Sequence, residues 1–136
     1  MTAKERLLAS LVRRDSSGAV QRLHAFLVAT GFKWKDRNET MMYFSRDDGG
    51  KELGLVAMRP GLISFPRNFW ERRPQALAAA VNALPANQRI RPDDGWFHSS
   101  QYSAGQLALD SSTEEGILRV IREVVVPEAR KAGAKL

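Results

Sequence analysis

The stretch TMMYFSRDDGGKELGLVAM, from Thr40 to Met58, decides the fold. It holds two runs rich in strand-forming residues, Thr40–Ser45 and Glu52–Met58. Between them, Asp-Gly and Gly-Gly supply the positive φ angles that tight turns require, and this is the strongest hairpin signal in the chain. The stretch therefore predicts an antiparallel hairpin.

Strand patterns continue on both sides of this hairpin. Phe32–Lys35 (FKWK) alternates apolar and basic residues, as a strand with one solvent-facing side does. After the hairpin, RPGL fits a type II turn with Gly61 at positive φ, and Leu62–Phe65 follows as a fourth strand. Each link is too short for a parallel crossover, so these strands are predicted to form a consecutive antiparallel meander.

Helical spacing appears before and after the meander. Residues 4–13 have a short apolar stripe, so residues 1–14 form either a helix or a mobile amphipathic arm. A second helix extends to Thr30 and stops at Gly31, which is an expected C-terminal cap. A third covers Pro74–Leu84, with a proline in its first turn.

The last helix is predicted to begin at a capping box formed by Ser112 and Glu115. Three residues spaced i, i+4, i+7 on its apolar face are expected to be buried, namely Ile117, Ile121 and Val124. Pro127 is expected to kink or end this helix, which leaves residues 128–136 as a frayed basic tail.

These elements combine into one α+β domain covering residues 1–136. Their order is two helices, four strands, a helix, two strands (Trp96–Tyr102 and Gly105–Asp110) and a helix. Because the strands are consecutive and the helices flank them, we expect a two-layer fold, an antiparallel meander sheet covered by helices on one face. This order resembles in topology alone the layout of type III secretion chaperones (helix, three strands, helix, two strands, helix), and we assign the chain to no family on that basis.

The composition excludes several classes of function. The chain has no cysteine, which rules out disulfides, thiolate zinc sites, thiol nucleophiles and iron–sulfur clusters. It contains neither of the glycine-rich phosphate-binding motifs, so no nucleotide cofactor is expected. No apolar run approaches the roughly 18 residues of a membrane span. We expect a bacterial-type cytoplasmic protein with no cofactor, no metal ion and no membrane contact.

The net charge of +6 is unevenly distributed along the chain. Residues 1–37 carry eight basic and three acidic groups, and residues 67–92 carry five and one. The two remaining segments are nearly neutral or acidic. Such asymmetry favours attraction to polyanions.

The stretch SFPRNFWERRP, from Ser64 to Pro74, contributes to the second basic block. Arginine binds phosphate in a bidentate fashion, and aromatic rings stack on bases. The candidate anion-binding residues are Arg67, Trp70, Arg72, Arg73, Arg89, Arg91, Lys33 and Lys35. Alternatively, Trp70 is a packing plug at the end of the sheet and the arginine stems lie over it. We expect both roles, with packing first.

Catalytic and metal-binding interpretations have weaker support. Asp93, His98 and Ser100 are the ingredients of a hydrolase triad, but the chain has no GxSxG nucleophile motif. Carboxylates around the hairpin turn, such as Asp47 and Glu52, have a spacing that suits Mg²⁺, yet turn formation alone explains the aspartates.

The sequence therefore favours a non-enzymatic small binding domain with a basic, aromatic-flanked surface for an anionic partner, with nucleic acid as the leading candidate. One alternative is a protein-interaction module, either a homodimer or chaperone-like. Another is a small hydrolase or nuclease.

Overall fold

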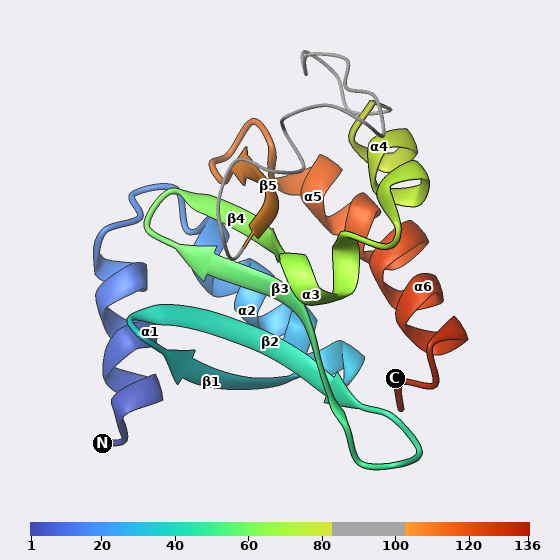
Figure 1. Cartoon of the computed structure of the whole chain (residues 1–136). Helices are drawn as coiled ribbons and strands as arrows, with labels where there is room; N and C mark the ends of the chain where they lie inside the picture. Colours follow the sequence, from blue (N-terminus) through green and yellow to red (C-terminus); the bar gives the residue numbers. More distant parts are fainter. Residues whose placement is uncertain (83–102) are drawn as a thin grey trace.

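The computed structural model of the chain describes residues 1–82 and 103–136, and its centre is one open five-stranded sheet (Figure 1). The spatial order of the strands is their order in the sequence, and every neighbouring pair is antiparallel. The strands are β1 (Lys33–Arg37), β2 (Thr40–Arg46), β3 (Glu52–Arg59), β4 (Leu62–Pro66) and β5 (Ser103–Ala108). The predicted meander is confirmed.

The turns between these strands account for the short links. Asn38 and Glu39 connect β1 to β2 with φ angles of 51° and 65°, a two-residue link with both residues in the left-handed region. Gly61 has a φ of 73° between β3 and β4, as the turn prediction requires. In the loop between β2 and β3, the Asp47 carboxylate accepts hydrogen bonds from the amides of Gly49 and Lys51. The hairpin is thus held by local bonds that its own sequence supplies.

Helices precede the sheet, follow β4 and end the described chain. They are α1 (Ala3–Arg13), α2 (Ala19–Thr30), α3 (Arg67–Trp70), α4 (Pro74–Asn82), α5 (Glu114–Val120), the π-helical η2 (Ile121–Val125) and α6 (Val126–Lys131). The order follows the prediction, with the short helix α3 added after β4. The sequence predicts two strands late in the chain. Gly105–Asp110 corresponds to β5, whereas Trp96–Tyr102 lies outside the described residues.

The fold is α+β, with helices gathered on one face of the antiparallel sheet. Figure 1 shows α2 behind the sheet, α1 at its left end beside β1 and β2, and the run from α5 to α6 along its right side. The core between the layers combines α2 residues such as Leu23 and Leu27 with strand residues such as Met41, Leu55 and Ile63, all fully buried. Burial of this apolar surface is the main term that holds helices to sheet.

The first helix packs against the sheet. Its Leu11 is buried, and α1 contacts β1 and β2. Thr2 caps it, because its side chain accepts from the Glu5 amide while the Glu5 carboxylate accepts from the Thr2 amide. Of the two interpretations of residues 1–14, the helix is the one observed.

The buried face of the last helical run differs from the predicted one. Ile117 and Ile121 are buried, but Val124 is only half-buried and Val125 takes its place in the core. The cause is the π-helical turn η2, whose i to i+5 bonding inserts an extra residue and moves the apolar face forward by one position. The prediction for Val124 was therefore wrong because it assumed an unbroken α-helix.

Pro127 and the segment after it also differ from the expected frayed tail. Pro127 lies in the first turn of α6, directly after η2, and Ala129 is fully buried. Beyond the helix, the Lys135 amide donates to the Arg46 carbonyl at 3.1 Å, and the Ser45 hydroxyl donates to the Lys135 carbonyl at 3.4 Å. Residues 128–136 are thus fixed beside the end of β2.

The start of α5 differs from the predicted one. No side chain caps its first residue, Glu114, and the predicted box of Ser112 and Glu115 does not form. Instead, the Asp110 carboxylate accepts from the amides of Ser112 and Thr113 and orders the turn before the helix. The Ser112 hydroxyl donates to the same carboxylate. This bond, followed by those from the two amides, lowers the pKa of Asp110.

In residues 1–82 and 103–136, no helix is both long and apolar enough to cross a membrane.

Candidate anion-binding surface on the open face of the sheet

The sheet face opposite α1 and α2, which we call the open face, carries the basic residues of β1. Lys33, Lys35 and Arg37 alternate along this edge strand and share one side of the sheet. The register places Lys35 opposite Met42 on β2 and Arg37 opposite Thr40. The expectation that Lys33 and Lys35 project from one face agrees with this pairing.

A broad depression of about 1040 Å³ lies over the open face and the adjoining side of α3. Among the described residues, six basic side chains line it, namely Arg37, Lys51, Arg59, Arg67, Arg72 and Arg73. Three carboxylates line it as well, namely Asp47, Glu52 and Glu71. The excess of cations makes the depression attractive to an anionic ligand.

Trp70 does not contribute a stacking surface to this depression. Its side chain is fully buried, and its indole Nε1 donates a 2.8 Å hydrogen bond to the Leu55 carbonyl. Its ring makes edge-on contacts with Phe65 and Phe69, at centroid distances of 5.8 and 4.9 Å. The geometry at Trp70 is that of the packing plug, since no face of the ring is left for a base.

Arg73 lines the depression but is committed to packing. Its guanidinium donates to the Phe69 carbonyl at 2.8 Å and stacks over the Phe69 ring at 3.9 Å. It also approaches the Glu128 carboxylate of α6 at 3.9 Å. The two Phe69 contacts hold the guanidinium against α3, and the approach to Glu128 links it to α6. Arg73 is therefore poorly placed to reach a ligand.

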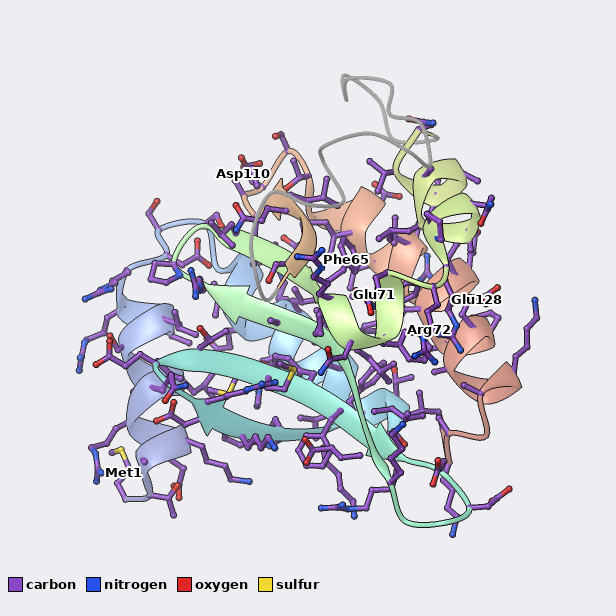
Figure 2. All side chains as sticks on the ribbon, viewed as in Figure 1. Met1, Phe65, Glu71, Arg72, Asp110 and Glu128 are labelled. Carbon is purple, nitrogen blue, oxygen red and sulfur yellow. The ribbon has the colours of Figure 1, made fainter. Side chains whose placement is uncertain are left out.

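Arg67 and Arg72 are the members of the predicted cluster that the depression presents to solvent. Arg67 is half-buried and forms an ion pair with Glu71, one helical turn later, at 3.4 Å. Arg72 is exposed and takes part in none of the ion pairs of the described residues. Figure 2 shows Glu71 and Arg72 at the end of α3. A partly exposed pair one helical turn apart, such as Arg67–Glu71, contributes little stability.

The two lysines of β1 have different surroundings. Lys35 forms a 2.6 Å ion pair with Glu52 and lies 5.2 Å above the Phe44 ring. Lys33 is exposed and does not line the depression. Lys35 therefore neutralises a carboxylate of the open face, and Lys33 stands outside the depression.

Sequence reasoning missed two of the depression's arginines. Arg37 continues the alternation of Lys33 and Lys35, and this period-two spacing was a signal that could have found it. Arg59 lies at the end of β3, where its guanidinium Nε donates to the Thr40 hydroxyl at 3.1 Å. Only the pairing of the strands brings it beside Arg37.

The remaining predicted residues lie outside the described residues or have structural partners. Arg89 and Arg91 lie outside the described residues, as do Asp93, His98 and Ser100 of the hydrolase interpretation. Across residues 1–82 and 103–136, no group of three or more acidic or histidine side chains is placed to hold a metal ion.

His24, the other histidine of the chain, lies behind the sheet rather than on the open face. Its ring Nδ1 is 2.8 Å from the Tyr43 hydroxyl, and its ring packs edge-on against Trp34 at 4.6 Å. Burial lowers the pKa of His24, and the nearby Lys4 ammonium lowers it further. Burial raises the pKa of Tyr43. This cluster joins α2 to β2 and is remote from the cationic depression.

Comparisons with protein families, with curated proteins and with solved structures give no match to this chain.

Proposed function

We propose that this protein is a non-catalytic binding protein whose open sheet face takes an anionic polymer, with nucleic acid as the favoured ligand. The observation that carries the proposal is the gathering of six basic side chains against three carboxylates around one depression. Clustered arginines bind phosphates through paired N–H groups, and a cationic groove follows a phosphate backbone. A bacterial cytoplasmic location, as the sequence suggests, would place the protein among such polymers.

The proposed binding depends on phosphate contacts rather than on base stacking. Phe69 and Trp70 are buried at 5% and 0% exposure, and Phe44 lies beneath Lys35 and Arg46. Within residues 1–82 and 103–136, no aromatic side chain of the open face is exposed enough to stack on a base. Contacts to phosphate carry no sequence information, so we expect little base preference.

The other candidate functions make different predictions. Binding between apolar protein surfaces responds weakly to ionic strength, whereas phosphate contacts weaken steeply as salt rises. A hydrolase or nuclease would consume its ligand. Intact recovery of a nucleic acid probe after long incubation with the protein separates binding from cleavage.

The test is fluorescence anisotropy with labelled single-stranded and duplex probes at low salt. The triple variant Arg37→Gln, Arg59→Gln, Arg72→Gln removes three cations of the depression. Its matched control is Arg13→Gln, Arg119→Gln, Arg122→Gln, which removes three exposed cations from helices and gives the same net charge. We expect the first variant to lose most binding and the control to keep it. Equal losses in both would show only a general charge effect and would contradict the assignment of the surface.

A further inference from the structure

Four of the six cations that line the depression form two separate clusters. The turn cluster consists of Arg37 and Arg59. Thr40 brings them together, because it pairs with Arg37 across the strands and its hydroxyl accepts a hydrogen bond from Arg59. The helix cluster consists of Arg67, the first residue of α3, and Arg72, two residues after its end. The two clusters lie at opposite ends of β4. Arg59 pairs with Leu62, the first residue of β4, and Arg67 follows Pro66, its last residue.

The length of β4 sets the distance between the clusters. Leu62 lies opposite Arg59, and four residue steps lead from it to Pro66, the residue before Arg67. At a rise of about 3.3 Å per residue, these steps span about 13 Å. This figure is the separation of the backbone positions, and two phosphates of one strand can span it.

Between the clusters, uncharged residues line the depression. They are Met42, Gly54, Ala57, Ser64 and Pro66. Gly54 keeps this floor low, because a Cβ at its position would lie 3.2 Å from the Met42 sulfur and 3.7 Å from the Pro66 ring. Its φ is not in the left-handed region, so close packing rather than backbone conformation explains the glycine. The floor suits an uncharged part of a ligand.

We propose that one single strand of nucleic acid crosses the open face, with one phosphate at the turn cluster and another at the helix cluster. This inference rests on the proposed function and narrows it to a ligand that reaches both clusters at once. The sugars and bases between the two phosphates lie over the neutral floor. Once one cluster holds the strand, the tether raises the effective concentration of the next phosphates at the other.

A duplex fits this arrangement less well than a single strand. Its bases are stacked inside, and both of its backbones present charge to the protein. The residues that line the floor between the clusters carry no charge, and Lys35, which lies on the same face opposite Met42, is paired with Glu52. A flexible strand can turn its uncharged groups towards the floor while its phosphates reach the rims.

The experiment is a length series of oligothymidylates, from a dinucleotide to about twelve nucleotides, bound to three forms of the full chain. These are the wild type, a turn-cluster variant (Arg37→Gln, Arg59→Gln) and a helix-cluster variant (Arg67→Gln, Arg72→Gln). A stacked strand advances about 3.4 Å per nucleotide, so about four steps separate the two bound phosphates and the wild type should show a rise in affinity at roughly five to six nucleotides. Either variant should remove that rise.

The effect of each variant should also depend on length. Loss of one cluster should weaken the dinucleotide by at most about twofold, because the other cluster still binds it. The same change should weaken a long strand about tenfold or more, since the linked contact is lost. A duplex of equal length should bind more weakly than the single strand at the same salt.

The outcomes separate this inference from the proposed function. A salt-sensitive affinity that grows smoothly with length, with equal effects of each variant on short and long strands, would overturn the two-cluster arrangement and leave polyanion binding standing. Tighter binding of the duplex would overturn the single-strand preference. No binding of any probe at low salt would remove both proposals. Circular dichroism and thermal melting of each variant confirm that a loss of binding is not a loss of folding.

Discussion

The indole Nε1 of Trp70 donates a 2.8 Å hydrogen bond to the backbone carbonyl of Leu55, which joins α3 to the centre of the sheet. Both residues are fully buried. The bond satisfies the only donor of the indole and fixes the edge-on packing of its ring against Phe65 and Phe69. Trp70 thereby positions α3, and with it Arg67 and Arg72, at the edge of the open face.

Replacing Trp70 by Ala should lower the free energy of unfolding by about 3–5 kcal/mol, because it leaves a large cavity and an unpaired Leu55 carbonyl. Urea unfolding followed by circular dichroism measures this loss. Where the variant remains folded, its nucleic acid binding should keep the wild-type dependence on salt. A normal stability together with weakened binding of single strands would show that Trp70 contacts the ligand directly.

The π-helical turn predicts different costs at two adjacent valines. Val125 is fully buried and Val124 is half-buried, so the same substitution probes both sides of the shifted face. Val125→Ala should destabilise by about 2 kcal/mol, and Val124→Ala by less than half of that. Ile121→Ala, at a fully buried position of the same turn, should cost about 2–5 kcal/mol. Equal losses at the two valines would contradict the π-helical register.

Two neighbouring arginines of the depression should behave in opposite ways. Arg73 contacts the Phe69 ring, the Phe69 carbonyl and Glu128, so Arg73→Gln should lower the melting temperature. Arg72 is exposed, so Arg72→Gln should leave the melting temperature within error and weaken polyanion binding. Melting curves and anisotropy titrations on both variants measure the contrast. Unchanged stability of the Arg73 variant would show that its three contacts contribute nothing.

The environment of His24 predicts a loss of stability in mild acid. Burial and Lys4 lower the folded-state pKa of His24 below its ordinary value of 6.5. The unfolded chain therefore binds the proton more readily, and stability falls as the pH drops below about 6.5 until the folded pKa is reached. Above that range the imidazole is neutral in both states and makes no pH-dependent contribution.

The measurement is the difference in unfolding free energy between wild type and His24→Gln from pH 7.5 down to about pH 5. We expect the wild type to lose stability relative to the variant over this range. His98 is present in both proteins, so the difference isolates His24. Four carboxylates have lowered pKa values and titrate below this window, namely Glu5, Asp15, Asp110 and Glu114. A constant difference across the range would contradict the effect of burial on His24.

Much of the sheet could be predicted because local chemistry determines it. Gly61 ends β3 and begins β4 through a turn that its positive φ permits, and Gly31 ends α2 in the same way. The alternation at Lys33 and Lys35 identified the side of β1 that faces solvent. Each of these signals lies within a few residues of its structural effect.

Features that depend on distant residues could not be predicted in this way. No local pattern signals the insertion of one residue at η2, and the ordered segment around Lys135 depends on its bonds to Ser45 and Arg46 of β2. The bond from Trp70 to Leu55 joins residues fifteen positions apart, so the sequence left its packing and binding roles open. Arg59 reaches the depression through strand pairing. Of the arginines that line the depression, the sequence-based set therefore included Arg67, Arg72 and Arg73 and left out Arg37 and Arg59.

The central claim is that the open face binds polyanions through its arginines, and the salt dependence of affinity tests it most directly. The logarithm of the affinity for a labelled single strand is measured against the logarithm of the salt concentration. Each lost phosphate contact should reduce the magnitude of the slope by about 0.7 for a single strand. The variant Arg37→Gln, Arg59→Gln, Arg72→Gln removes the turn cluster and one arginine of the helix cluster. It should therefore flatten the slope by about 0.7 to 1.4, the equivalent of one to two phosphate contacts, while the control Arg13→Gln, Arg119→Gln, Arg122→Gln keeps the wild-type slope. An unchanged slope in the first variant, or a larger change in the control, would contradict the account.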